Sequence, residues 1–134
     1  MTERGAIRNR QLAMQIRDFT GLRFGKITPT DIDGFLEFGD RLFVLIEGKR
    51  DGSPLAYGQM LAIARLADAC HAPPRRYATT IIVDHPTTDD DIVYADAVVR
   101  LYRWDGKWVY PKQTGITLRK AIDELLNIIH KPPL

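Results

Sequence analysis

Apolar residues recur along the chain with two different periods, and these periods separate predicted helices from predicted strands. Near both ends the apolar positions lie at helical spacing, with Leu12, Ile16 and Phe19 at one end and Leu118 and Ile122 at the other. Between them lie alternating or continuous apolar runs, rich in β-branched and aromatic residues, that are typical of strands. In chain order we expect a helix at 3–19, a short strand at 23–28, a hairpin within 30–49, a helix at 53–69, strands at 77–83, 95–104 and 107–110, and a helix at 117–129.

Helix-capping residues and prolines support this order. Ser53 and Pro54 suit the N-cap and the first position of the middle helix, and the run Ala72-Pro73-Pro74 suits its end. No repeat, low-complexity tract or linker interrupts the sequence, so we expect one domain spanning 1–134. Helices alternating with strands predict an α/β fold, a three-layer mixed central β-sheet flanked by helices.

The predicted hairpin has one purely apolar face and one mixed face. Because strand side chains alternate, even-numbered and odd-numbered residues point to opposite faces. The even positions are all apolar: Ile32, Leu36, Phe38, Leu42, Val44 and Ile46. The odd positions combine apolar side chains with four charged ones: Asp33, Glu37, Glu47 and Lys49.

The length of the turn decides whether the charged side chains meet. A two-residue turn at Gly39-Asp40 pairs residue 33 with 46 and places Asp33 and Glu47 on opposite faces. A three-residue loop pairs 38 with 42 and 33 with 47, so that both carboxylates share a face beside Lys49. The second register also keeps the apolar even positions together, and we therefore prefer it.

Two carboxylates and a lysine at neighbouring strand ends suit a hard divalent cation. Oxygen ligands favour Mg²⁺ or Mn²⁺, which can polarise a phosphoryl oxygen, and a lysine can neutralise developing charge. A structural salt-bridge cluster formed by Asp33, Glu47 and Lys49 explains the same spacing equally well.

The segment Thr30-Asp31-Ile32-Asp33, a short hairpin and Leu45-Ile46-Glu47-Gly48-Lys49 together resemble the PD-(D/E)XK nuclease superfamily. That superfamily includes Holliday-junction resolvases, restriction endonucleases and small phage nucleases. The resemblance covers residues 28–69 by motif and extends to about 104 by element order. It implies a restriction-endonuclease-like core and a Mg²⁺ or Mn²⁺ cofactor. By this resemblance Asp33, Glu47 and the carbonyl of Gly48 bind the metal, Lys49 is the catalytic lysine, and Gln59 is the glutamine on the following helix.

The sequence departs from the family pattern at the first acidic position. The aspartate follows Thr30 rather than a proline, and either Asp31 or Asp33 could be the first metal ligand. We favour Asp33 because it lies opposite Glu47 in the preferred register. Some family members carry a further acid on the first helix, and Glu3 is the residue that would supply it.

Composition and charge narrow the classes of protein. The 134 residues are 45% hydrophobic and 27% charged, an ordinary globular mixture, with a net charge of +2. One cysteine, Cys70, excludes an internal disulfide and is typical of a reducing compartment. We see neither a bilayer-spanning run nor a signal peptide, so we expect no membrane partner and a cytoplasmic location.

Basic residues concentrate near the N-terminus, where residues 1–26 hold six basic groups against two acidic ones. They either contact nucleic-acid phosphates or form a solvated helix face. The candidate phosphate-binding residues are Arg8, Arg10, Arg17 and Lys26.

Together these features predict a Mg²⁺-dependent nuclease that hydrolyses phosphodiester bonds, with duplex or branched DNA as the favoured substrate. A homodimer would suit the two strands of a duplex. The main alternative is a catalytically inactive nuclease-fold module that binds nucleic acid or a protein partner. A phage-encoded inhibitor of a host protein is a third.

Overall fold

The chain divides into two compact units, Met1–Thr30 and Asp31–Leu134, and the computed structural model describes residues 18–86 and 91–130. In the first unit the described residues form a 3₁₀ turn, η1 (Thr20–Leu22), and one isolated bridge between Phe24 and Ile27. The strand predicted at 23–28 is therefore only a tight turn, with Gly25 at a φ of +65°. Of the helix predicted at 3–19, residues 3–17 lie outside the described residues. Residues 18 and 19 are described and are not helical.

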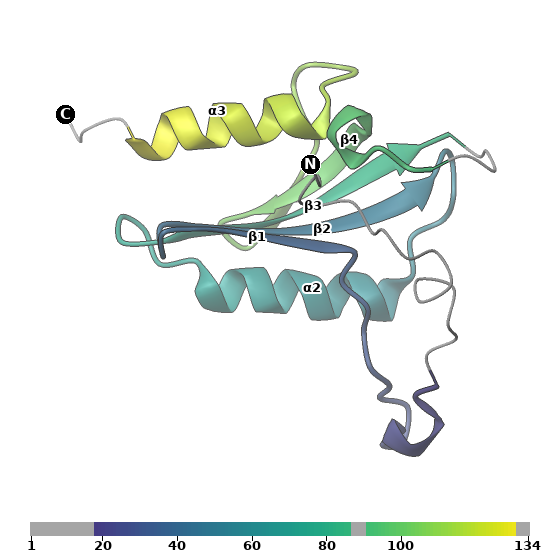
Figure 1. Ribbon diagram of the computed structural model, residues 1–134. Coiled ribbons are helices and arrows are strands. Elements are labelled where there is room, and N and C mark those ends of the chain that lie inside the picture. The colour runs from purple at the N-terminus through teal and green to yellow at the C-terminus, as the bar shows by residue number, and fades with distance from the viewer. Residues whose placement is uncertain (1–17, 87–90, 131–134) are drawn as a thin grey trace, which may run out of the picture. The chain divides into compact units, whose positions relative to one another are not determined.

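The larger unit is built on a five-stranded sheet in the order β1-β2-β3-β4-β5. Strands β2 and β3 are parallel and every other neighbouring pair is antiparallel, so the sheet is mixed. Two helices, α2 (Tyr57–Cys70) and α3 (Leu118–His130), lie on opposite faces of the sheet (Figure 1). The predicted α/β class, with a mixed sheet flanked by helices, is confirmed. The strands are β1 (Gly34–Phe38), β2 (Leu42–Arg50), β3 (Tyr77–His85), β4 (Val98–Trp104) and β5 (Lys107–Val109).

Each face of the sheet has its own apolar core. Alternation along β2 and β3 directs Val44 and Ile81 toward α3 and directs Ile82 toward α2, where it packs with Ile63 and Leu101. Thr80, which is fully buried, is satisfied because its hydroxyl donates to the Ile63 carbonyl at 2.9 Å. Both faces of the central strands are thus covered, which fixes their register and the ends where polar residues emerge. Within residues 18–86 and 91–130, no helix combines the length and the apolar character needed to cross a bilayer.

The hairpin adopts the preferred register. Phe38 pairs with Leu42 and Gly34 pairs with Ile46, and a three-residue loop containing Gly39 (φ +54°) joins the strands. The paired residues of β1 begin at Gly34. The residue before it, Asp33, still donates its amide hydrogen to the Ile46 carbonyl at 3.1 Å.

The apolar even face is only partly as predicted. Leu42, Val44 and Ile46 are buried against the α3 side, whereas Leu36, on the edge strand β1, is 38% exposed. Ile32 lies before β1 begins and lines a pocket on the α2 side with Phe35 and Phe43. Alternation does not extend to residue 32 because the chain has left the strand there.

The start of the middle helix is later than predicted. Helix α2 begins at Tyr57 after Ala56, and no side chain caps it, so the assignment of Ser53 as N-cap is wrong. Ser53 instead closes the turn after β2: its amide donates to the Arg50 carbonyl at 2.9 Å, and its own carbonyl accepts from Arg100. The hydrogen bond from Arg100 in β4 thus holds Ser53 in the turn, and Ser53 does not act as the N-cap that its residue type favours.

Candidate active site

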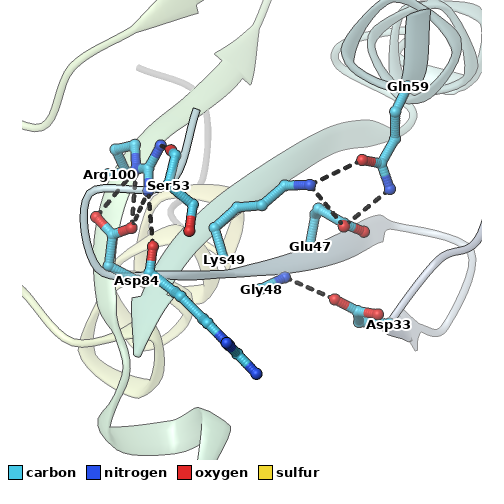
Figure 2. Close-up of polar contacts among 9 residues, drawn as sticks. Asp33, Glu47, Gly48, Lys49, Ser53, Gln59, Asp84 and Arg100 are labelled. Carbon is cyan, nitrogen blue, oxygen red and sulfur yellow. Dashed lines mark hydrogen bonds and ion pairs between the residues drawn. The ribbon is translucent and has the colours of Figure 1, made fainter. Parts of the chain in front are cut away.

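The end of the β1–β2 hairpin brings five residues expected from the sequence into one site (Figure 2). Asp33 precedes β1; Glu47, Gly48 and Lys49 lie in β2; and Gln59 lies in the first turn of α2. Asp33 is connected to β2 directly, because its Oδ2 accepts a hydrogen bond of 2.7 Å from the Gly48 amide.

Glu47, Lys49 and Gln59 form a closed polar triangle on the α2 side of the sheet. The Lys49 ammonium donates to Gln59 Oε1 at 2.9 Å, and the Gln59 amide donates to Glu47 Oε1 at 2.8 Å. Lys49 Nζ also lies 3.5 Å from Glu47 Oε1. These three side chains therefore hold one another's orientation, and the glutamine places the lysine next to the glutamate.

Glu47 is the buried charge of the site, with only 5% of the residue exposed. Burial raises the pKa of its carboxyl group, and the negative charge of Asp33 raises it further. Lys49 and Gln59 act in the opposite direction without cancelling the rise. The second oxygen, Oε2, is buried without a hydrogen-bond partner among the described residues. A buried carboxylate oxygen without a donor is costly, and either a proton or a bound cation would offset that cost.

The oxygen atoms at this strand end fit a hard divalent cation. Asp33 and Glu47 supply carboxylates, and the Gly48 carbonyl is a third donor. The N–H and C=O groups of one strand residue point toward the same neighbouring strand. Because the Gly48 N–H points toward Asp33, the Gly48 carbonyl also points to that side of β2, beyond the last β1 residue that pairs with it. Neither at this strand end nor elsewhere in the described part of the chain do three or more His, Cys, Asp or Glu side chains form a group that could hold a metal ion. A set of two carboxylates and one carbonyl suits Mg²⁺ and Mn²⁺, because Mg²⁺ keeps several of its waters.

The remaining predicted residues lie apart from this cluster or outside the described residues. Asp31 is exposed and forms no hydrogen bond or ion pair with any residue that the structure describes, so it is Asp33 rather than Asp31 that lies against Gly48. Lys26 belongs to the first unit and is exposed. The other candidates, Glu3, Arg8, Arg10 and Arg17, lie outside the described residues.

Tyr94 is a site residue that the sequence analysis missed. It begins the 3₁₀ turn η2 (Tyr94–Asp96), and its ring lies over Gly48 from the α3 side. Burial, the negative charges of Asp33 and Glu47, and hydrogen bonding to Asp33 raise the pKa of Tyr94 to about 12. Its hydroxyl therefore remains protonated at neutral pH. No motif or spacing in the sequence connects Tyr94 with the hairpin.

Arg100 is a second residue that the sequence does not reveal. From β4 its guanidinium donates through Nε to both carboxylate oxygens of Asp84, at 2.8 and 3.0 Å, and through Nη1 to the Ser53 carbonyl at 2.6 Å. Asp84 pairs with Lys49 across β2 and β3. Arg100 therefore fastens the turn after β2 to the strand beside the candidate lysine (Figure 2).

The site thus combines a buried carboxylate, a carboxylate at the strand edge, a main-chain carbonyl and a lysine held by a glutamine. This set can bind a cation and present a positive charge beside it. Comparison of the chain with protein-family models, curated proteins and solved structures finds no match.

Proposed function

We propose that this protein is a nuclease that uses Mg²⁺ or Mn²⁺ to hydrolyse phosphodiester bonds, with duplex or branched DNA as its substrate. The observation that carries the proposal is the meeting of Asp33, Glu47 and Lys49 at one strand end, where no residue that the structure describes donates to a buried Glu47 oxygen. The resemblance to the PD-(D/E)XK superfamily supports it, as does the order of hairpin, α2 and parallel β3, which suits a restriction-endonuclease-like core.

In this proposal Asp33, Glu47 and the Gly48 carbonyl hold the cation. When bound, a divalent cation supplies Lewis-acid polarisation of the phosphate and neutralises charge on it. Asp33 approaches from the loop before β1 and Glu47 from within β2, so the two carboxylates converge from different segments. The Gly48 amide already restrains Asp33, which reduces the reorganisation needed on binding.

Lys49 is the residue that acts on the reacting atoms. Its side chain is 18% exposed, so the ammonium can reach a phosphate or an attacking water while remaining tethered. A preorganised positive charge there stabilises the negative charge that develops on the phosphoryl oxygens. Gln59 is a positioning residue, because it contacts both Lys49 and Glu47 and fixes the distance between them.

A purely structural salt-bridge cluster accounts less well for the same contacts. Lys49 approaches Glu47 through Oε1, and Gln59 donates to that same oxygen, so two donors converge on one atom while Oε2 receives none. Two carboxylates and one ammonium at this strand end also leave an excess of negative charge. A group selected only for stability would lower this cost by pairing each charge or by replacing it with apolar residues.

The proposal is tested by incubating the full chain with labelled single-stranded, duplex and branched DNA in Mg²⁺, in Mn²⁺ and in EDTA. We expect metal-dependent cleavage that falls by about 100-fold or more in Lys49→Ala and Glu47→Ala. Lys107→Ala and Glu124→Ala, which alter exposed residues outside the site, are matched controls and should cleave at the wild-type rate.

The same assay distinguishes the alternatives. Binding of DNA with no cleavage of any substrate in either metal would contradict the enzyme and indicate an inactive binding module. Cleavage that persists in Lys49→Ala and Glu47→Ala would show that another site performs the reaction. Sedimentation of the protein mixed with duplex DNA measures how many copies bind one duplex, and two copies would suit cleavage of its two strands.

A further inference from the structure

Tyr94 is attached to the α3 side of the sheet by main-chain hydrogen bonds and by packing. Within η2 the Ala97 amide donates to the Tyr94 carbonyl at 3.1 Å, and the Ala97 carbonyl accepts from the Leu118 amide at 2.8 Å. The first residue of α3 therefore fastens η2 in place, and the Tyr94 ring packs against the apolar core on that face. A side chain held in this way can impose a position on whatever it touches.

The Tyr94 ring approaches β2 at the one residue that lacks a side chain. A Cβ placed on Gly48 would lie 2.7 Å from Tyr94 Cε1 and 2.8 Å from the Tyr94 hydroxyl oxygen, which is closer than real Cβ atoms come. A glycine inside a strand weakens it, and a close approach by another group is a common reason to find one there. Gly48 and Tyr94 are therefore a matched pair, in which the glycine makes room for the tyrosine.

The Tyr94 hydroxyl lies against the residue that holds Asp33, and Asp33 is the proposed ligand least restrained by secondary structure. Asp33 is exposed and precedes β1, whereas Glu47 is fixed within β2. Its carboxylate accepts a hydrogen bond from the Gly48 amide on one oxygen, and the Tyr94 hydroxyl, which lies against Gly48, is close enough for the Asp33 charge to raise the pKa of Tyr94. A hydroxyl donor at this place would add a second restraint, from a different segment, to the one that the Gly48 amide supplies.

We infer that Tyr94 is a positioning residue of the metal centre, whose hydroxyl holds the Asp33 carboxylate from the α3 face in the orientation that lets it share a divalent cation with Glu47. This inference rests on the proposed function. Tyr94 acts through Asp33, as outer-shell partners of metal ligands do. Because its hydroxyl touches no reacting atom, we expect its loss to weaken metal affinity and to leave the chemical step unchanged.

The test is to compare wild type with Tyr94→Phe by Mn²⁺ calorimetry without DNA and by cleavage across a Mn²⁺ series. We expect the Kd for Mn²⁺ and the half-saturating Mn²⁺ concentration to rise about 10-fold or more. At saturating Mn²⁺, kcat should return close to the wild-type value. Tyr110→Phe changes an exposed tyrosine, 74% of which is accessible, and should leave both quantities unchanged.

A second comparison separates positioning from a general packing defect. Gly48→Ala should weaken Mn²⁺ binding because the new methyl group displaces the ring, and adding Tyr94→Phe to it should weaken binding little further. Fully additive losses would show that the two residues act independently, and the inference would fail.

The outcomes for the two proposals are distinguishable. If wild type takes up no Mn²⁺, the proposed function itself fails. If wild type binds Mn²⁺ and Tyr94→Phe binds it equally well, only the role of Tyr94 is refuted. A loss of kcat that saturating Mn²⁺ does not restore would equally refute positioning through Asp33.

Discussion

Glu47 is the residue at which stability and the proposed function oppose each other. Its carboxylate is buried, one of its oxygens has no hydrogen-bond partner among the described residues, and the Asp33 charge adds to the cost of ionising it. The pKa of Glu47 in the folded chain therefore lies above the 4.5 of an ordinary glutamate. The folded state consequently holds this proton more tightly than the unfolded state. The contribution of Glu47 to stability thus falls as pH rises from 4.5 through the raised pKa.

This asymmetry predicts that Glu47→Gln is more stable than wild type in EDTA at pH 7.5, by roughly 0.5–2 kcal/mol. The gain should shrink at pH 4, where the wild-type carboxyl is largely protonated in both states. Urea unfolding followed by tryptophan fluorescence measures both values, and Glu124→Gln serves as the exposed control. A less stable Glu47→Gln at pH 7.5 would mean that the contact with Lys49 outweighs the cost of burial.

Addition of metal should reverse the ranking. By the proposed function, Mn²⁺ at 100 times its Kd should stabilise wild type by about 2.7 kcal/mol, because only the folded chain would present the site. Glu47→Gln loses a charged ligand and should gain far less. Equal stabilisation of the two proteins would place the cation elsewhere.

At the scale of elements, the connection between β2 and α2 decides where Gln59 lies. Helix α2 has no side-chain cap, and the turn before it is held by Arg100 through the Ser53 carbonyl at 2.6 Å and the Arg50 carbonyl at 3.3 Å. The same guanidinium pairs with Asp84, and both side chains are about four-fifths buried, at 19% and 22% exposed. Arg100 is the extra residue of a β-bulge, since Leu101 pairs with Ile82 and Val99 with Val83. The bulge therefore lies at the point where β4, through Arg100, contacts the turn between β2 and α2.

We expect Arg100→Met to destabilise the protein by about 2 kcal/mol, because Asp84 and two carbonyls lose a charged donor in a partly buried setting. Arg119→Met removes an exposed pair with Asp123 and should change the free energy of unfolding by less than about 0.5 kcal/mol. Urea unfolding at pH 7 compares the two. A near-neutral Arg100→Met would show that the turn holds without its clamp, and Gln59 would then keep its place by other contacts.

At the scale of the whole molecule, the two units differ in the sign of their charge. Residues 1–30 carry six basic and two acidic groups, whereas residues 31–134 carry thirteen and fifteen, a net charge of −2. The unit that holds the candidate site is therefore slightly negative, and the excess of positive charge belongs to the smaller unit. A nuclease that must approach a polyanion would draw its long-range attraction from the first 30 residues.

Replacing four basic residues of the first unit by glutamine should reduce the salt dependence of DNA binding. We expect the slope of log Kobs against log salt to fall by about 0.9 for each phosphate contact removed. A matched variant with four exposed basic residues of the larger unit replaced should change the slope little. Equal slopes for the two variants would contradict phosphate binding by the first unit. The test set is Arg8, Arg10, Arg17 and Lys26, and the control set is Arg65, Lys107, Lys112 and Lys120.

The sequence by itself determined the hairpin and the meeting of its polar residues. Asp33 with Gly48, and Gln59 with Glu47 and Lys49, are contacts between residues 10 to 15 positions apart. Side-chain alternation and the length of one turn fix the register that brings Asp33 beside β2, because a slip by one residue would expose the buried face. The Gln59 contacts are expected only from the resemblance to a nuclease family, and they depend on the turn that Arg100 holds. The class of fold followed from the same periodicities.

Only the tertiary structure decided the surroundings of those residues. Parallel pairing of β2 with β3 and the return of β4 bring in Arg100, which is 47 positions from Ser53, and the attachment of η2 to α3 places Tyr94 over Gly48. Tertiary contacts also hold Ser53 in a turn instead of at the N-cap of a helix, and they bury the Glu47 carboxylate. The physical reason is that burial and long-range hydrogen bonds depend on what the folded chain stacks against each strand, which no local pattern encodes.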